Sequence, residues 1–272
     1  MSSSTPAVLS ERRGPLLLLR LNRPEARNAL NGELVAALHT ELVAAQSDPG
    51  VRCAVLCGAG KVFSAGADLK ALQALGAASS EENRADSQRL ADLLHLIYTS
   101  RLPIVAAVEG AAVAGGAGLA SVCDLVVAGE GARLGYTEVR LGFVAAVVMV
   151  FLVRAVGEKH ARELLLTGRL VPAAEAWRMG LVNEVVPGGA GRGPGAGTGR
   201  RDRPGQQHRP GEHPRDAEPA AGHGAGRRPA LRRGHERLDP HHRRPEGRRG
   251  GLPGQARAVL ACAARVGRMI LT

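Results

Sequence analysis

The chain has 272 residues and a mass of 28.3 kDa, which is enough for one large domain or two small ones. Its formal net charge of +11 lies entirely in the last third. Residues 1–189 carry 18 Lys and Arg against 18 Asp and Glu, whereas residues 190–272 carry 18 Arg against 7 Asp and Glu. This distribution excludes any interpretation that treats the isoelectric point of about 10.8 as a property of a folded domain.

Apolar runs with strand and helix patterns alternate along the first two thirds of the chain. Strands are predicted at 16–19, 51–57, 104–108, 124–128 and 181–186. Asn31 is expected to cap a helix that ends near Gln46, because Leu34, Leu38 and Leu42 fall on one face. Further helices are predicted from about Leu69 and over 84–100, 115–122, 143–156, 158–167 and 172–179. Strands that alternate with helices predict an α/β layer architecture.

The composition changes after Pro187. Gly, Arg, Pro and His make up 42 of the 60 residues from 191 to 250, so this stretch cannot bury enough apolar surface to offset its ordering entropy. We therefore divide the chain into a core, residues 1–187, and a segment, residues 188–272, that lacks core-forming composition. Disorder is favoured over a nucleic-acid-binding tail because no aromatic residue follows Trp177 to stack on bases.

The composition of this segment also fits DNA that is read in the wrong frame. Gly, Arg, Pro and Ala have GC-rich codons, and a GC-rich gene read out of frame yields them in excess. When residues 235–260 are back-translated with GC-rich codons and read from the second base, an amphipathic helix with Trp, Phe and Lys results. We hypothesise a single frameshift near residues 188–192, which sequencing of the gene tests.

The four cysteines are too few and too scattered for a disulfide framework, so reduced thiols in a cytoplasmic protein are expected. No Cys-x-x-Cys pair or neighbouring histidine supports a metal site. The longest apolar stretch, residues 143–153, is about half of what a bilayer requires, and the first five residues lack an apolar signal core. Neither a bound metal nor a membrane anchor is therefore expected.

Three segments could carry chemistry. Residues 63–69 and 109–120 are runs of small residues that lead into helices, and two such helix starts facing each other would form an oxyanion hole with two N–H donors. Tight helix packing is the simpler alternative for each run. Glu138 is an acid in a mostly apolar stretch and a candidate general base, with a solvated surface residue or a helix cap as the alternative.

Together and in this order, the segments resemble the enoyl-CoA hydratase/isomerase family, also called the crotonase family, over about residues 8–187. The resemblance rests on Leu21–Asn31, Phe63–Leu69, Ala114–Gly116, Cys123–Leu125, Leu166–Gly168 and Gly180–Val182. It implies a crotonase-like spiral of ββα units, a coenzyme A thioester as substrate and no further cofactor. It also implies a homotrimer or a dimer of trimers, without nucleic acid or membrane as a partner.

The resemblance also implies roles for individual residues. Ala65 and Gly116 would supply the two N–H donors to the thioester oxygen, and Glu138 would move the proton. The residues implied to bind substrate are Ala26, Arg27, Ala29, Gly66, Ala67, Asp68, Leu69 and Gly115. One departure is that hydratases of this family commonly use two glutamates, of which the second matches Glu138 whereas the first falls on Gly118. Another is that residues 144–146 replace a Pro-Gly-rich turn and can reshape the acyl pocket.

The expected activity is hydration of the 2,3 double bond of an enoyl-CoA through a stabilised enolate. A Δ3,Δ2-enoyl-CoA isomerase is the alternative, because one carboxylate is enough to carry a proton between two carbons. A non-catalytic family member is the third interpretation. If the family's C-terminal helices are absent, apolar surface of the core is exposed, and an unstable or aggregating product is expected.

Overall fold

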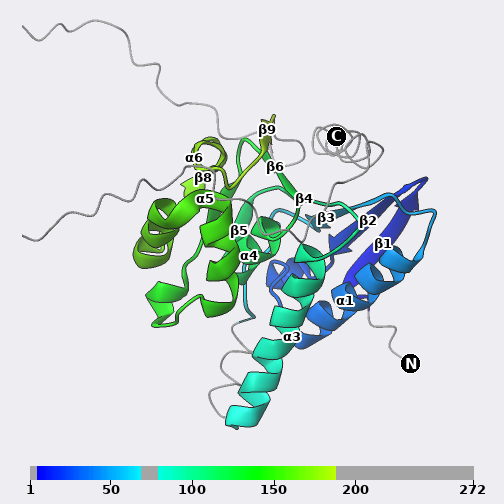
Figure 1. The fold of residues 1–272 in the computed structure, drawn as a ribbon, viewed down its shortest axis with the longest axis horizontal. Helices are drawn as coiled ribbons and strands as arrows, with labels where there is room; N and C mark the ends of the chain where they lie inside the picture. The colour runs from blue at the N-terminus through cyan, green and yellow to red at the C-terminus, as the bar shows by residue number, and fades with distance from the viewer. Residues whose placement is uncertain (1–4, 69–78, 188–272) are drawn as a thin grey trace, which may run out of the picture. The chain divides into compact units, whose positions relative to one another are not determined.

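The computed structural model describes residues 5–68 and 79–187, and these form a mixed α/β unit (Figure 1). Its strands are β1 (Val8–Arg13), β2 (Leu16–Leu21), β3 (Cys53–Gly58), β4 (Ile104–Val108), β5 (Ala111–Val113), β6 (Leu125–Gly129), β7 (Arg133–Gly135), β8 (Val171–Pro172) and β9 (Glu184–Val186). Its α-helices are α1 (Gly32–Ser47), α3 (Ser80–Tyr98), α4 (Gly115–Ser121), α5 (Ala146–Thr167) and α6 (Ala173–Arg178), and its 3-10 helices are η1 (Pro24–Ala26) and η2 (Glu138–Leu141).

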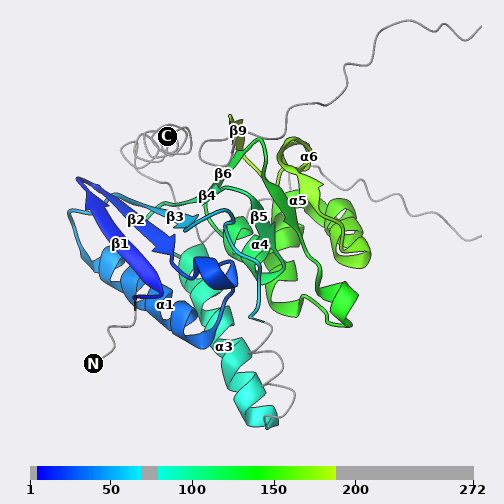
Figure 2. The same cartoon turned by 180° about the vertical axis from the view of Figure 1, so that it is seen from behind.

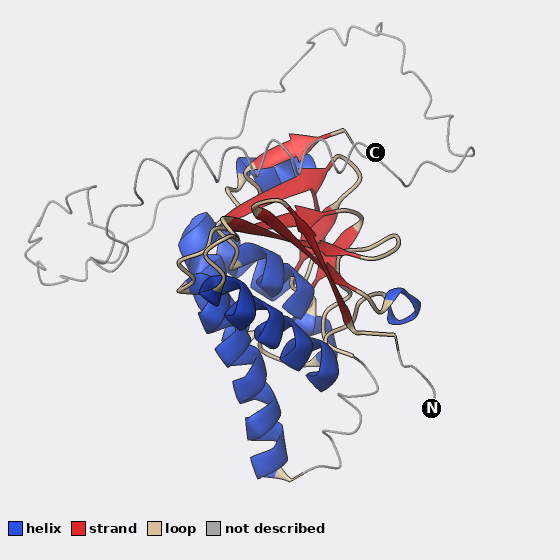
Figure 3. Ribbon diagram, turned by 90° about the vertical axis from the view of Figure 1, so that its right-hand side faces the viewer, coloured by secondary structure: helices blue, strands red, loops and turns tan. Residues whose placement is uncertain are grey.

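Six strands form the main sheet, in the order β1-β2-β3-β4-β6-β9. The strands β1 and β2 make an antiparallel hairpin, and each later strand is added in parallel to the same edge. Parallel neighbours need a crossover, and the helices between them supply it. The long helices consequently lie along one face of the sheet (Figure 3). Strands β5, β7 and β8 form a small second sheet.

The main apolar core lies between the sheet and these helices. It contains Leu19 and Leu56 from the strands, and Leu38 of α1 and Leu93 of α3 from the helices, all at most 1% exposed. On the opposite face of the sheet a second cluster consists of strand residues. These are Leu16, Leu18, Cys53, Val55, Val105, Ala107, Val127 and Val186, and we call this surface the outer face. The β1–β2 hairpin and α5 lie at opposite ends of the described unit (Figure 2).

The expected α/β class is confirmed, and most predicted elements are present. Asn31 caps α1, because its side-chain Oδ1 accepts a hydrogen bond of 3.0 Å from the Leu34 N–H. The helix predicted over 143–156 begins only at Ala146. Gly157, with φ +75°, divides α5 into two helical parts, which correspond to the two helices predicted over 143–156 and 158–167. The helix predicted from Leu69 lies outside the described residues. None of the described helices has the length and apolarity needed to cross a membrane.

Candidate active site

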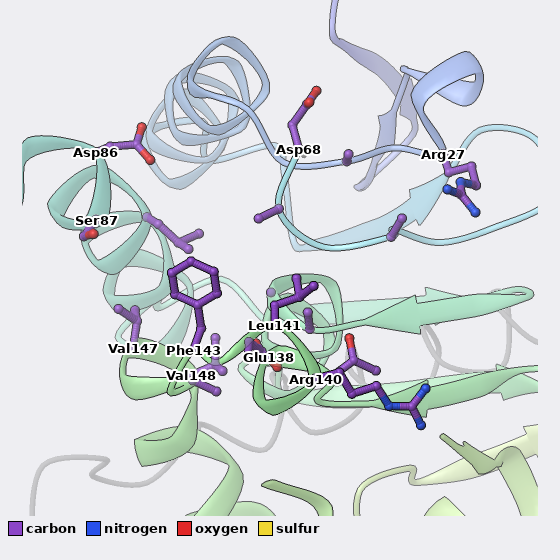
Figure 4. A pocket seen from close by; sticks show the side chains of 18 of the residues that line it. Arg27, Asp68, Asp86, Ser87, Glu138, Arg140, Leu141, Phe143, Val147 and Val148 are labelled. Carbon is purple, nitrogen blue, oxygen red and sulfur yellow. The ribbon is translucent and has the colours of Figure 1, made fainter. Parts of the chain in front are cut away.

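A cavity of about 1050 Å³ opens where η1, the segment 65–68, the first half of α3 and the start of α5 meet (Figure 4). Its small wall residues are Ala26, Ala29, Ala65, Ala67, Ala114, Gly115, Ala145 and Ala146. Its apolar side chains are Leu90, Leu141, Phe143, Val144, Val147 and Val148. Its polar and charged residues are Arg23, Glu25, Arg27, Asp68, Asp86, Ser87, Thr137, Glu138 and Arg140. The small residues leave backbone amides open to a ligand.

Hydrogen bonds fix the segment 65–68 against residues 27–30. The Ala65 N–H donates to the Arg27 carbonyl at 3.0 Å, and the Asp68 N–H donates to the Leu30 carbonyl at 3.0 Å. The Leu30 N–H in turn donates to the Gly66 carbonyl at 2.7 Å. Between these bonds, the Ala67 N–H has no acceptor among the described residues, and Ala67 lines the cavity. Ala67 therefore offers an amide that is available to a ligand.

The second small-residue run approaches the first at Gly66. A Cβ placed on Gly66, whose φ is +89°, would lie 2.8 Å from the Ala114 Cβ and 3.4 Å from the Gly115 nitrogen. Only glycine therefore permits this approach. Ala114 itself has φ +52° and turns the chain into α4, and the Gly115 N–H that follows has no acceptor within the described part of the chain. Two open amides, of Ala67 and Gly115, thus belong to segments in direct contact.

The predicted donors differ from these two amides. Ala65 lines the cavity, but its N–H is already bonded to Arg27. Gly116 is buried and is not part of the cavity wall, since a Cβ on it would lie 2.7 Å from the Ser64 Cβ. Each predicted donor is thus one or two residues from an open amide that lines the cavity. The prediction missed the open amides because successive N–H groups of a chain point in different directions. The N–H of Ala65 is used in the pairing with residues 27–30, so it is not free to bind a ligand.

Glu138 begins η2 and is half-buried at the cavity wall, where Figure 4 shows its side chain near Leu141 and Val148. Burial raises the pKa of its carboxyl group above the ordinary value, and a hydrogen bond from its own backbone N–H partly opposes this shift. Its buried Oε2 has no hydrogen-bond partner among the described residues. A carboxyl group with an open oxygen and a raised pKa is suited to accept and return a proton.

Most of the predicted substrate-binding residues line the cavity, namely Ala26, Arg27, Ala29, Ala67, Asp68 and Gly115, together with the predicted donor Ala65. Gly66 is buried between its neighbours. Leu69 lies outside the described residues. Gly118 is buried behind Val148, which occupies the cavity wall at this point. No group of three His, Cys, Asp or Glu side chains within residues 5–68 and 79–187 could hold a metal ion.

Sequence reasoning missed two residues that hold the η1 side of the cavity. Asn28 is completely buried, with φ +54°, and its amide donates to the carbonyls of Ala59 at 2.8 Å and Val62 at 2.9 Å. Arg23 donates to the Ala29 carbonyl at 2.7 Å and forms an ion pair of 3.0 Å with Asp68. The local sequence carries no signal for either role, because the carbonyl partners of Asn28 and the carboxylate partner of Arg23 lie more than 30 residues further along the chain.

The cavity thus brings together open backbone amides and a half-buried carboxyl group, which are groups that can stabilise negative charge on an oxygen atom and move a proton. The comparisons agree. The family model of enoyl-CoA hydratase/isomerase matches residues 11–190. A Thermus thermophilus protein named an enoyl-CoA hydratase is 56% identical over 177 residues, covering 65% of this chain and 70% of its own length. The crotonyl-CoA hydratase of Syntrophomonas wolfei is 38% identical over 181 residues, covering 66% and 68%.

Among solved structures, the enoyl-CoA hydratase of Mycobacterium smegmatis superimposes with a TM-score of 0.65 at 38% identity, over 67% of this chain and 71% of that one. The chain therefore belongs to the enoyl-CoA hydratase/isomerase family, and the crotonase-like fold expected from its motifs is confirmed. The boundary proposed between a core of residues 1–187 and the segment 188–272 stays a prediction.

Proposed function

We propose that this protein is an enoyl-CoA hydratase, which adds water across the 2,3 double bond of an enoyl-CoA thioester. The observation that carries the proposal is the presence of the Ala67 and Gly115 amides and the Glu138 carboxyl group in one cavity wall. The relatives named as hydratases support the same activity. A coenzyme A thioester is the substrate, and no further cofactor takes part in the proposed reaction.

The two amides act on the thioester carbonyl oxygen. When water attacks the β-carbon, the electron pair of the double bond moves toward the carbonyl, and negative charge gathers on this oxygen. Amides fixed by their backbone hydrogen bonds need no reorganisation to stabilise that charge, and one such donor is typically worth about 10²–10³ in rate. We assign these roles to Ala67 and Gly115, because the amide predicted at Ala65 is bonded to Arg27 and Gly116 lies behind the wall.

Glu138 moves the proton. Its carboxylate accepts a proton from water while the water oxygen bonds to the β-carbon, and an enolate results. The protonated carboxyl group then delivers a proton to the α-carbon, the carbonyl re-forms, and the carboxylate is restored. The open Oε2 of Glu138 suits this exchange. A single acid–base group of this kind typically contributes about 10²–10⁴ in rate.

The cavity has an arginine-lined end and a mostly apolar end. Figure 4 shows Arg27 and Arg140, well separated from each other, on one side of Glu138, and Phe143, Val147 and Val148 on the other side, where Asp86 and Ser87 of α3 also lie. The arginines suit the phosphates of coenzyme A. The apolar end suits the acyl chain, and a second cavity of about 410 Å³ adjoins it, shares Glu138 and Phe143, and is lined further by Met149 and Leu165. The proposed substrate therefore crosses the cavity with its thioester at Glu138.

Assembly of several copies fits the exposed surface near the site. Large apolar side chains are exposed along η2 and the start of α5: Leu141, Phe143, Val144, Met149, Val150 and Val153. Contiguous apolar exposure of this kind marks association surfaces. We propose a homotrimer or a dimer of trimers in the cytoplasm. Light scattering tests the assembly, and a monodisperse monomer with full activity would contradict it.

Incubation with crotonyl-CoA tests the proposed reaction. Hydration removes the conjugation of the double bond with the thioester, so the absorbance of the conjugated enoyl group should fall with time. A 3-enoyl-CoA serves as the comparison substrate, because its isomerisation would create the same absorbance. If the absorbance rises with the 3-enoyl-CoA and does not fall with crotonyl-CoA, the enzyme is an isomerase and not a hydratase. If the absorbance changes with neither substrate, the protein is a non-catalytic family member.

A further inference from the structure

The strand that leads to Glu138 is joined to the beginning of helix α4 by a backbone hydrogen bond. The Ala114 N–H, which directly precedes the open Gly115 amide, donates to the Gly135 carbonyl at 2.8 Å. Gly135 is the last residue of β7, and Glu138 follows shortly after it at the start of η2. This bond holds the donor end of α4 beside the segment that carries the carboxyl group.

A second connection holds the far end of the same helix. The Tyr136 hydroxyl donates to the Ser121 Oγ at 3.1 Å, and this Oγ in turn donates to the Gly118 carbonyl at 3.0 Å. Ser121 is the last residue of α4, whereas Tyr136 lies between β7 and Glu138. The two connections together attach both ends of α4 to the segment that carries Glu138.

The Tyr136 side chain is completely buried and lies close to Glu138. It is 0% exposed, and it lines the second cavity together with Glu138. Burial raises the pKa of its hydroxyl above the ordinary value; the hydrogen bond to Ser121 opposes this rise, and the charge of Glu138 adds to it. The hydroxyl therefore stays protonated at neutral pH. A buried donor is costly to leave unpaired, and Ser121 provides its partner.

Helix α4 has few large side chains that could fix it by packing. It is 7 residues long, and of its buried residues Leu119 alone is larger than alanine. Small side chains make few van der Waals contacts, so each of them resists a shift of the helix only weakly. The hydrogen bond from Tyr136 at the end of α4 therefore contributes substantially to where the helix, and with it the Gly115 amide, is held.

We propose that Tyr136 is a positioning residue of the reaction. Through Ser121 it fixes α4 so that the Gly115 amide and the Glu138 carboxyl group act on one substrate molecule. This role rests on the proposed function, because the two groups act in the same step. Tyr136 needs no contact with the substrate. Loss of the connection should slow the chemical step more than it weakens binding, since a misplacement of about 1 Å can cost about 10²-fold in rate.

Tyr136→Phe in the full chain tests this role. Phenylalanine keeps the ring, and the Ser121 hydroxyl keeps its bond to the Gly118 carbonyl, so no buried donor is left unpaired and the variant should fold. With crotonyl-CoA, kcat should fall about ten-fold while KM changes by less than about two-fold. Tyr98→Phe is the matched control. The Tyr98 hydroxyl accepts a hydrogen bond of 3.0 Å from Arg154 away from the cavity wall, and its loss should leave kcat unchanged.

Ser121→Ala separates positioning from stability. Alone, it leaves the buried Tyr136 hydroxyl without its acceptor, so the melting temperature and kcat should both fall. In Ser121→Ala/Tyr136→Phe neither hydroxyl is present, so the melting temperature should recover while kcat stays about ten-fold low. A kcat that recovers together with the melting temperature would overturn the proposal, because the bond would then serve stability alone.

An unchanged kcat in folded Tyr136→Phe would also overturn the proposal, as would an equal loss of kcat in Tyr98→Phe. If Ser121→Ala does not fold, the comparison of the two tyrosine variants decides. Absence of turnover by the unmodified protein is a different result, because it contradicts the proposed function itself, and the role of Tyr136 falls with it. Normal turnover by the unmodified protein together with the loss in Tyr136→Phe and not in Tyr98→Phe supports the proposal.

Discussion

Gly118 of α4 lies directly against Val148 of α5. A Cβ built on Gly118 would be 2.2 Å from the Cγ1 and 2.7 Å from the Cβ of Val148, distances that real side chains do not reach. Val148 lines the cavity, so an apolar side chain fills the space beside Gly118, the position on which the family resemblance places one of two glutamates. The packing of α5 on α4 thus requires glycine at 118 and leaves Glu138 as the carboxyl group beside this wall.

Gly118→Glu should therefore destabilise the protein. Forcing a larger side chain into a packed core typically costs about 1–3 kcal/mol, and a buried charge adds to this. The double variant Gly118→Glu/Val148→Ala should regain part of the loss because it removes the contact. Thermal unfolding of both variants measures the effect. Gly131→Glu is the control, since nothing lies within 4 Å of a Cβ there, and an equal loss at both glycines would contradict the packing argument.

Glu138→Gln should raise the stability of the folded protein at neutral pH. Burial raises the pKa of Glu138, so the folded state favours the protonated carboxyl group. Its deprotonation destabilises the fold as pH rises from the ordinary glutamate value of about 4.3 through the raised value. Melting temperatures of both proteins should therefore agree at low pH and diverge toward neutral pH. A difference that is the same at every pH would show that desolvation of Glu138 is not its cause.

Gly66→Ala should impair catalysis more than substrate binding. The added Cβ would meet the Val113 carbonyl oxygen at 2.7 Å and the Ala114 Cβ at 2.8 Å, and would push the two donor segments apart. Because the amides act mainly on the enolate, kcat should fall by about 10²-fold or more, with a smaller change in KM. Gly14→Ala is the control. Its φ of +63° makes alanine similarly strained there, but nothing lies within 4 Å of an added Cβ, and Gly14 does not line the cavity.

Arg27→Gln should weaken binding of the coenzyme A portion. Arg27 is exposed and lines the arginine-lined end of the cavity, so the proposed contact with a phosphate would be screened by solvent and worth up to about 1 kcal/mol. KM should rise roughly two- to five-fold with kcat nearly unchanged, and the difference should shrink at high salt. Arg101→Gln, also exposed but not part of the cavity wall, should leave KM unchanged. Equal effects of both substitutions would contradict the assignment of Arg27.

Much of this arrangement was predictable from the sequence. Asn31 and the leucines that follow predicted α1, and the strands β2, β4 and β6 were visible as apolar runs. The three-residue strands β5 and β7 were not, because they are too short to show a period of two. The loops that bear the donors were predicted, but the open amide of each loop depends on partners distant in sequence. The pairing of Leu30 with Gly66 and Asp68 leaves Ala67 open, and no local pattern reveals this pairing.

The most direct measurement of the central claim is the initial rate of crotonyl-CoA hydration by the unmodified protein and by Glu138→Gln, each at saturating substrate. The absorbance of the conjugated enoyl group should fall with the unmodified protein. Glu138→Gln should lower kcat by about 10²–10⁴-fold while the folded state and substrate binding are retained. Turnover by a folded Glu138→Gln variant at the rate of the unmodified protein would contradict the assignment of Glu138 as the proton-transferring group.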